Sequence, residues 1–323
     1  MIPQLWIGID LIGFSFETDR EGHRVRVSFP STPDAFSSLP ESIADQWLPS
    51  LVPAGPVFDE PDRDNRTVGL VIFEVTVEVS TDVPFPKPEE VTPELRAIAD
   101  RDLGVGRDIA TQVAVLLLRH LRAAAPHQSW LGLATHAPEQ YGIAALEFRA
   151  TGDHILGYGP MQSVTMRSSR IRLDVEDMHH IAAATSEDIE PGVAESLLAD
   201  VSHLSDASGA NDRDRAWIVA AIACEVRVKR ELRARAASDQ RELVELLLRR
   251  RSNLPDLLGE VWKAVVGTSL RAVNPDLFDK VNSLNMQRNR LVHAGQRDPR
   301  VPQHLDPAHI AQALFEWLDE GAP

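Results

Sequence analysis

Residues Leu284 to Gly295 read LNMQRNRLVHAG and combine an apolar helical pattern with a compact set of polar side chains. Leu284, Leu291 and Val292 supply the apolar positions that anchor such a segment as a helix against a core. Asn289 and His293 are i,i+4 neighbours on this helix, so the amide can hold the imidazole in one orientation. The stretch therefore predicts a packed helix that carries a polar cluster near its end.

Arg288 is the third polar member of this cluster and precedes His293 by five residues. On a regular helix these two side chains diverge by roughly 140° around the axis. One copy of the cluster therefore has difficulty placing both groups on a single phosphate, whereas two copies that face each other can do so.

Arg288, Asn289 and His293 match the motif of the HEPN family, which this stretch resembles: an arginine, a polar residue, a few variable positions and a histidine. HEPN domains are helical, and their active members are ribonucleases that need no metal ion. Spacing alone is not specific, because residues 122–127 and 149–154 also run from Arg to His across four positions. In both of those stretches an alanine follows the arginine, and a proline or a glycine lies inside. The resemblance therefore depends on Asn289, the helical setting and the C-terminal position.

Composition limits the class of protein. The chain has 323 residues, enough for two domains that each bury a core, and its 43% hydrophobic and 25% charged content is typical of a soluble globular protein. The net charge of −15 argues against a nucleic-acid-binding surface over the whole chain, because phosphate contacts come from Lys and Arg, but it leaves room for a local basic patch.

Cysteine usage and the absence of targeting patterns indicate the compartment. Cys224 is the single cysteine, so no internal disulfide forms, and its apolar neighbours favour a core residue over a nucleophile. The N-terminus lacks a signal-peptide pattern, and the apolar runs are too short to cross a bilayer. We expect a soluble, cytoplasmic protein without a membrane segment.

The first half of the chain shows mainly strand patterns. Residues Arg24–Phe29 alternate polar and apolar side chains after a turn at Gly22, and Val68–Val79 is rich in β-branched residues. Residues 94–125 change to a helical period, and Gly104 and Gly106 predict either two helices or one broken helix. We therefore expect an α+β domain over residues 1–184, with mostly antiparallel strands and one major helix.

The remainder, residues 185–323, has helical patterns throughout. These patterns predict a helix at Val193–Leu204, a long helix capped by Asp212 or Asp214, another helix that turns Leu243, Leu246 and Leu247 inward, a helix at Leu254–Val266, a helix that begins at Pro275, and a last helix that begins at Asp306-Pro307. We expect an all-α helical bundle, which is also the fold that the HEPN resemblance implies.

Two further features are candidates for function. Glu225 interrupts an apolar helical face; it either faces the cleft and orients Arg288 or lies at the rim of the core, paired with a nearby Arg. The run from Arg227 to Arg251 is locally basic, and Arg249, Arg250 and Arg251 are the candidate RNA-binding residues. Its glutamates also fit a solvated helix face. No His or Cys pairs occur at zinc-ligand spacing, so we expect no metal and no cofactor.

The resemblance implies a metal-independent endoribonuclease. Arg288 offers bidentate donation to a phosphate, and His293 belongs to the residue type that most readily transfers protons at neutral pH. The implied product carries a 2′,3′-cyclic phosphate, and the implied assembly is a homodimer through the C-terminal domain. The resemblance also suggests a toxin or phage-defence effector, with the N-terminal domain as a sensor or substrate-recognition domain and with an antitoxin or regulatory partner.

A second interpretation expects the same fold without catalytic activity. In it, the C-terminal domain is an inactive HEPN-like module for dimerisation or ligand binding, and the N-terminal domain senses a signal. The acidic composition fits this interpretation better, whereas the complete set of Arg288, Asn289 and His293 fits the nuclease better. The sequence leaves both open.

Overall fold

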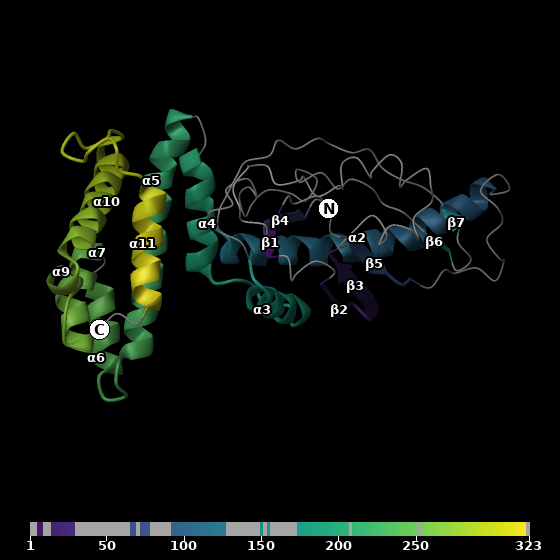
Figure 1. The fold of residues 1–323 in the computed structure, drawn as a ribbon, viewed down its shortest axis with the longest axis horizontal. Helices are drawn as coiled ribbons and strands as arrows, with labels where there is room; N and C mark the ends of the chain where they lie inside the picture. Colours follow the sequence, from purple (N-terminus) through teal and green to yellow (C-terminus); the bar gives the residue numbers. More distant parts are fainter. Residues whose placement is uncertain are drawn as a thin grey trace. The chain divides into compact units, whose positions relative to one another are not determined.

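The computed structural model describes residues 5–8, 14–29, 65–68, 72–77, 92–126, 149–150, 154–155, 173–206, 209–250 and 253–320 (Figure 1). The chain divides into two compact units. The first comprises Met1–Ala125 and Thr135–Glu190, and the second comprises Pro126–Ala134 and Pro191–Pro323. The change from one unit to the other at Pro191 lies close to the boundary expected after residue 184.

An antiparallel sheet of three strands organises the first unit. Strand β2 (Ser15–Arg20) pairs with β3 (His23–Ser28), which also pairs with β5 (Ile72–Val75). Glu21 and Gly22 join β2 to β3 with φ angles of 53° and 79°, the left-handed conformations that a tight hairpin turn requires. The hairpin predicted around Gly22 is therefore confirmed.

Two shorter pairs complete the described strands, and both are antiparallel. β1 (Leu5–Gly8) pairs with β4 (Asn65–Val68), and β6 (Arg149–Ala150) pairs with β7 (His154–Ile155). The long strand expected at Val68–Val79 is thus represented by the end of β4 and by β5. Residues 143–148 and 156–172, where further strand patterns occur, lie outside the described residues.

The main helix of the first unit corrects the expectation of a break. α2 (Pro93–Ala124) continues through both Gly104 and Gly106. A Cβ atom on Gly106 would come within 2.7 Å of the Val77 side chain, so the missing side chain lets the helix approach the sheet closely. A second helix, α3 (Val175–Ser186), was not predicted; it begins with a capping box formed by Asp174 and Asp177.

The second unit is helical in every element that the structure describes. The elements are α4 (Val193–Asp206), α5 (Ala210–Arg235), α6 (Arg241–Arg250), α7 (Leu254–Asp256), the π-helical turn η6 (Leu257–Val261), α8 (Trp262–Val266), α9 (Leu270–Val273), α10 (Pro275–Ala294) and α11 (Pro307–Asp319). The helical character expected for this part of the chain is confirmed.

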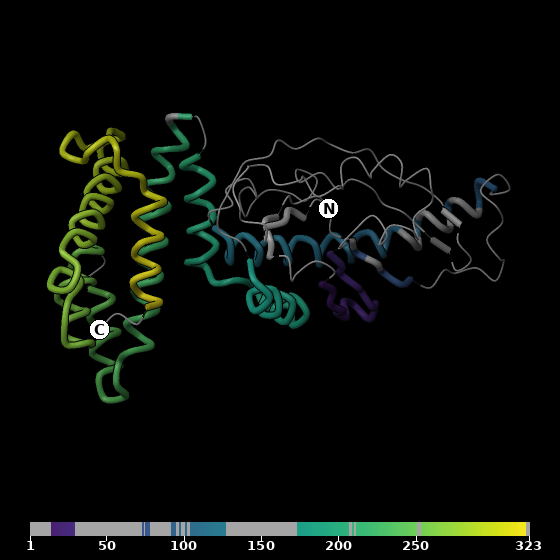
Figure 2. The backbone as a smooth tube through the Cα atoms, viewed as in Figure 1, coloured from purple at the N-terminus to yellow at the C-terminus, as the bar shows by residue number. Residues whose placement is uncertain are grey.

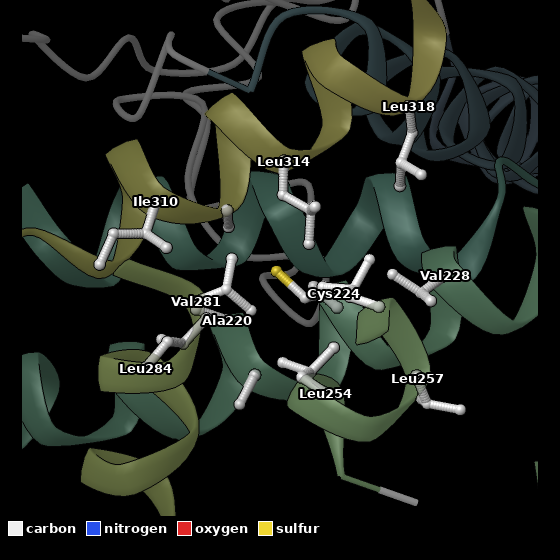
Figure 3. Packing of buried hydrophobic residues seen from close by; sticks show 14 of the residues in the cluster. Ala220, Cys224, Val228, Leu254, Leu257, Val281, Leu284, Ile310, Leu314 and Leu318 are labelled. Atoms are coloured by element: carbon white, nitrogen blue, oxygen red, sulfur yellow. The ribbon is translucent and has the colours of Figure 1, made fainter. Parts of the chain in front are cut away.

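Helix α5 is the central element of this unit. α4, α10 and α11 all pack on it, and Figure 2 shows α10 and α11 running alongside it. Figure 3 shows the core that they share, in which Cys224 of α5 lies among aliphatic side chains from α5, α7, η6, α10 and α11. Burial raises the pKa of the Cys224 thiol to about 12, so Cys224 is a core residue, as its neighbours in the sequence indicated.

Two local predictions in this unit are wrong. α5 begins earlier than expected, with Gly209 at its N-cap position in place of Asp212 or Asp214. In α6 the buried side chains are Val244 and Leu248, while Leu243 and Leu246 are exposed. The helix is short and lies at the edge of the unit, so a single narrow stripe is enough to attach it.

None of the described helices combines the length and the apolar character that a membrane span requires.

Candidate functional site

Helix α10 positions the polar cluster. Asn274 caps its start by accepting a hydrogen bond from the Leu277 N–H at 3.1 Å, and Pro275 occupies the first helical position. Gly295, with φ 63°, ends the helix, and its N–H donates to the Leu291 carbonyl at 3.0 Å. Both ends of the helix are therefore fixed by local sequence.

The buried stripe of α10 determines which way the cluster faces. Leu277, Val281, Leu284 and Leu291 are buried against the core of the unit. Val292 is 50% exposed and His293 is exposed. His293 therefore lies on the outer side of the helix, where a second molecule can reach its imidazole.

Arg288 and Asn289 lie together on the flank of this helix, and both are half-buried. The Arg288 Nη1 atom donates a hydrogen bond to the Asn289 Oδ1 atom at 2.9 Å. The i,i+4 hydrogen bond expected between Asn289 and His293 is not among the contacts of the described residues. Asn289 therefore orients the guanidinium, and the imidazole stays unrestrained by its own helix.

The loop after α10 folds back on the helix and is fixed by three contacts. Gln287 Oε1 accepts the Asp298 N–H at 2.9 Å, Arg300 holds the Asp298 carboxylate at 2.7 Å, and Arg297 pairs with Asp214 at the start of α5 at 2.6 Å. The hydrogen bonds from Arg300 lower the pKa of Asp298 to about 2. The loop is thereby attached both to α10 and to the first turns of α5.

Glu225 has a partner other than the expected one. Its carboxylate pairs with Lys229, one turn further along α5. No contact between Glu225 and Arg288 occurs among the described residues. The structure thus shows Glu225 in a helix-surface ion pair, of the kind considered as its alternative role, but with Lys229 as the cation.

Most cations in the basic run of α5 are held by carboxylates. Arg227 contacts Glu195 at 2.6 Å and also pairs with Glu231 and Asp319. Further pairs are Arg230 with Glu195 and Glu231, Arg233 with Glu245, and Arg235 with Glu231. This part of the run is a network of ion pairs between α4, α5, α6 and α11, and its charge is locally balanced.

Arg249 and Arg250 are exposed in the last turn of α6, and Arg251 lies outside the described residues. Asp214, near the start of α5, contacts the loop after α10, whereas Arg233, near the end of α5, contacts α6. These two positions are about 28 Å apart along the helix. Figure 1 likewise shows α6 and the loop after α10 at opposite ends of the helical unit.

Among the described residues, no group of three or more His, Cys, Asp or Glu side chains is arranged to hold a metal ion. Comparisons of the chain with protein-family models, with curated proteins and with solved structures found no match. The candidate site is therefore defined by its own geometry: Arg288 and Asn289 joined on one flank of α10, and His293 on its outer side.

Proposed function

We propose that the chain is a metal-independent endoribonuclease of the HEPN type and that it acts as a homodimer through its helical unit. The observation that carries the proposal is the state of the cluster on α10. Arg288 makes no ion pair within the described residues, and its guanidinium is oriented by Asn289 alone. His293 is exposed one turn away. An oriented cation and an accessible imidazole, brought together from two copies of α10, suit phosphate chemistry.

The proposed reaction is transesterification within the RNA backbone. A base removes the proton of a 2′-hydroxyl, and the 2′-oxygen attacks the adjacent phosphorus. The bond from phosphorus to the 5′-oxygen breaks, and an acid protonates that leaving oxygen. The products carry a 2′,3′-cyclic phosphate and a 5′-hydroxyl. His293 performs the proton transfers, and Arg288 stabilises the charge that develops on the phosphate oxygens.

A dimer supplies what one chain lacks. One imidazole does not easily serve as base and acid in the same step, and Arg288 and His293 diverge around α10 by roughly 140°. A two-fold axis beside α10 would bring two copies of the cluster to one phosphate. Val292, half exposed next to His293, provides an apolar contact for such a self-complementary surface.

Other parts of the chain receive secondary roles in this proposal. The exposed Arg249 and Arg250, with Arg251, contact RNA away from the cut. The first unit acts as a sensor or substrate-recognition domain, and an antitoxin or another regulatory partner restrains a toxin or phage-defence nuclease of this kind. These roles follow from the family resemblance and from the exposure of α6.

The reaction is tested by incubating the purified full chain with mixed-sequence RNA and with DNA of the same sequence in excess EDTA. The expected result is cleavage of RNA alone, with cyclic-phosphate ends and with a specific rate that rises with protein concentration as dimers form. Cleavage of the DNA, or ends without cyclic phosphate, would contradict the mechanism, because DNA has no 2′-hydroxyl.

A second candidate function is an inactive dimerisation or ligand-binding module of the same fold. The ion-paired arginines of α5 favour it, because carboxylates already hold the guanidinium groups that would otherwise contact RNA phosphates. This candidate predicts dimers in solution and intact RNA in the same assay.

A further inference from the structure

A pocket of about 400 Å³ opens in the helical unit beside α10. It lies between the last turn of α4, the first turns of α5, Gln287 of α10 and the loop between α10 and α11, which Figure 1 shows at one end of the unit. A volume of this size is within the range of pockets that hold small ligands. The cluster of Arg288, Asn289 and His293 does not line it.

Gln287 gives the pocket a fixed pair of donors. The residue is only 2% exposed, and its Oε1 atom accepts the Asp298 N–H at 2.9 Å. This bond determines which end of the amide is the oxygen, so the Nε2 group is the end that remains. Within the described residues, Nε2 has no hydrogen-bond partner. Because Gln287 lines the pocket, its two N–H groups are available to an acceptor there.

Ser205 is a second unsatisfied group in the pocket wall. Its Oγ atom is buried and has no partner among the described residues, although the residue lines the pocket. Leaving a buried polar group unpaired costs about 1–3 kcal/mol. Because the Oγ atom is buried, a ligand in the pocket does not reach it, and the Gln287 amide is the group that presents free donors to an acceptor there.

Arg213 is the available cation of the pocket. The other charged side chains of the wall are occupied: Arg297 pairs with Asp214, Asp298 with Arg300, and Asp306 caps α11. The exposed Arg213 side chain makes no ion pair within the described residues. Trp217, Val301 and Leu305 add an apolar surface. The wall therefore combines one free positive charge, neutral donors and apolar side chains.

We propose that this pocket binds a nucleotide: the ring edge accepts hydrogen bonds from the Gln287 amide, and Arg213 binds the phosphate. An anion without a ring would leave the apolar wall and the Gln287 amide unused, and an apolar ligand would leave Gln287 and Arg213 unsatisfied. A nucleotide has the acceptor edge, the flat apolar faces and the charge that the wall requires.

The position of the pocket suggests RNA as the source of this nucleotide, an assignment that rests on the proposed function. Gln287, Arg290 and His293 follow one another at intervals of three residues, each turned by about 60° from the last. His293 therefore lies about 9 Å further along the axis than Gln287, with the exposed Arg290 between them. A strand held in the pocket can pass Arg290 and present a neighbouring phosphate to His293.

Nucleotide binding is tested with the full chain and the four ribonucleoside 5′-monophosphates by titration calorimetry. We expect one nucleotide bound per chain, with an affinity reduced about tenfold or more in Arg213→Gln and in Gln287→Glu, since each loses a charge-assisted or donated hydrogen bond. Gln287→Glu keeps the oxygen that accepts the Asp298 N–H. Arg241→Gln, which removes a charge from α6, is the matched control and should bind as the native chain does.

Two results would overturn the proposal: no binding of any monophosphate at millimolar concentration, or binding that survives both Arg213→Gln and Gln287→Glu. If Gln287→Glu fails to fold, the affinity measured for Arg213→Gln, a substitution at an exposed residue, is sufficient to test the proposal. His293→Ala should bind nucleotide normally. If the native chain binds nucleotide but does not cleave RNA, the proposed nuclease activity is rejected while the proposed nucleotide-binding pocket is supported.

The source of the nucleotide is decided by cleavage kinetics. If the pocket holds a nucleotide of the substrate, the free monophosphate competes with RNA, and Arg213→Gln raises KM and relaxes the preference for the base beside the cut. If the monophosphate instead changes the rate at saturating RNA while Arg213→Gln leaves KM unaltered, a free nucleotide is the ligand, and the assignment to RNA is overturned.

Discussion

The helical unit contains two groups of arginines in opposite states. On α5, Arg227 and Arg230 share Glu195, and Arg235 holds Glu231, so each guanidinium is neutralised by a carboxylate. On α10, Arg288 donates to the neutral Asn289, so no carboxylate among the described residues balances its positive charge. Both groups look equally basic in the sequence. The comparison shows that the partners of an arginine, more than its presence in a basic run, determine whether it can bind a phosphate.

Burial separates the two groups further. The Arg227 side chain is 11% exposed, and its guanidinium lies 5.5 Å from the centre of the Phe315 ring as well as against its carboxylates. Moving such a group to a phosphate would remove a largely buried partner from Glu195, Glu231 and Asp319. The α5 network therefore joins helices of the unit, whereas the Arg288 guanidinium on α10 has no carboxylate partner among the described residues.

The largest expected effect comes from removing the available charge. Arg288→Gln should lower the rate of RNA cleavage about a hundredfold to a thousandfold, because the developing phosphate charge loses its bidentate donor. Lys280→Gln removes an exposed cation from the same helix and should leave the rate unchanged. Equal rates for the native chain and Arg288→Gln in a single-turnover assay would place the chemistry elsewhere.

The next largest effect is a loss of stability when an ion-paired arginine of α5 is removed. Arg227→Ala should lower the free energy of unfolding by about 2–3 kcal/mol, because Glu195, Glu231 and Asp319 lose a largely buried partner. Arg230→Ala removes a cation that is 45% exposed and should cost clearly less. Urea denaturation of both variants measures this difference. If Arg227→Ala were the milder of the two, the network would not have the structural role assigned to it.

A smaller effect is expected from the exposed end of α6. Replacing Arg249, Arg250 and Arg251 with Gln should reduce the slope of log affinity for single-stranded RNA against log salt by about 2, if each contacts one phosphate. The rate at saturating RNA should not change, because α6 lies at the opposite end of the unit from α10. The triple Lys variant keeps the charge and should keep the slope. A slope that is the same in all three proteins would show that these arginines only solvate the helix.

The smallest effect is a dependence of stability on pH at the loop after α10. The pKa of Asp298 is lowered from 3.8 to about 2 by the hydrogen bonds from Arg300, so the ionised form stabilises the folded chain above pH 4. This contribution is lost as the pH falls from about 4 towards 2. The native chain should therefore be more stable than Asp298→Asn at pH 6, and the two should converge in acid. Thermal unfolding at several pH values measures the difference, and a gap that persists at pH 2 would assign it to another cause.

Local patterns were sufficient to predict much of the fold. The hairpin at Gly22, the start of α10 at Pro275 and the start of α11 at Asp306-Pro307 all depend on turn and cap residues that act within a few positions. Gly106 was misjudged because its role depends on Val77, which lies just after β5 and is distant from Gly106 in the sequence. Leu243 and Leu246 were misjudged because the packing of α6, more than its own sequence, selects its buried face.

The functional features of the helical unit also divide into those that local sequence predicted and those that it did not. Arg288, Asn289 and His293 are neighbours in one helix, so the sequence predicted them as a set. The partners of the α5 arginines were not predictable, because Glu195 and Asp319 come from α4 and from the end of α11. The pocket was missed for the same reason: Ser205, Arg213 and Gln287 belong to three different helices and form no motif in the sequence.

We propose that the exposed imidazole of His293 on α10 performs the proton transfers of RNA cleavage. The most direct measurement compares the native chain with His293→Ala on RNA in excess EDTA, with His309→Ala, an exposed histidine on α11, as the matched control. We expect cleavage by the native chain and by His309→Ala, and a loss of about a hundredfold to ten-thousandfold in His293→Ala. Undiminished cleavage by His293→Ala would contradict it.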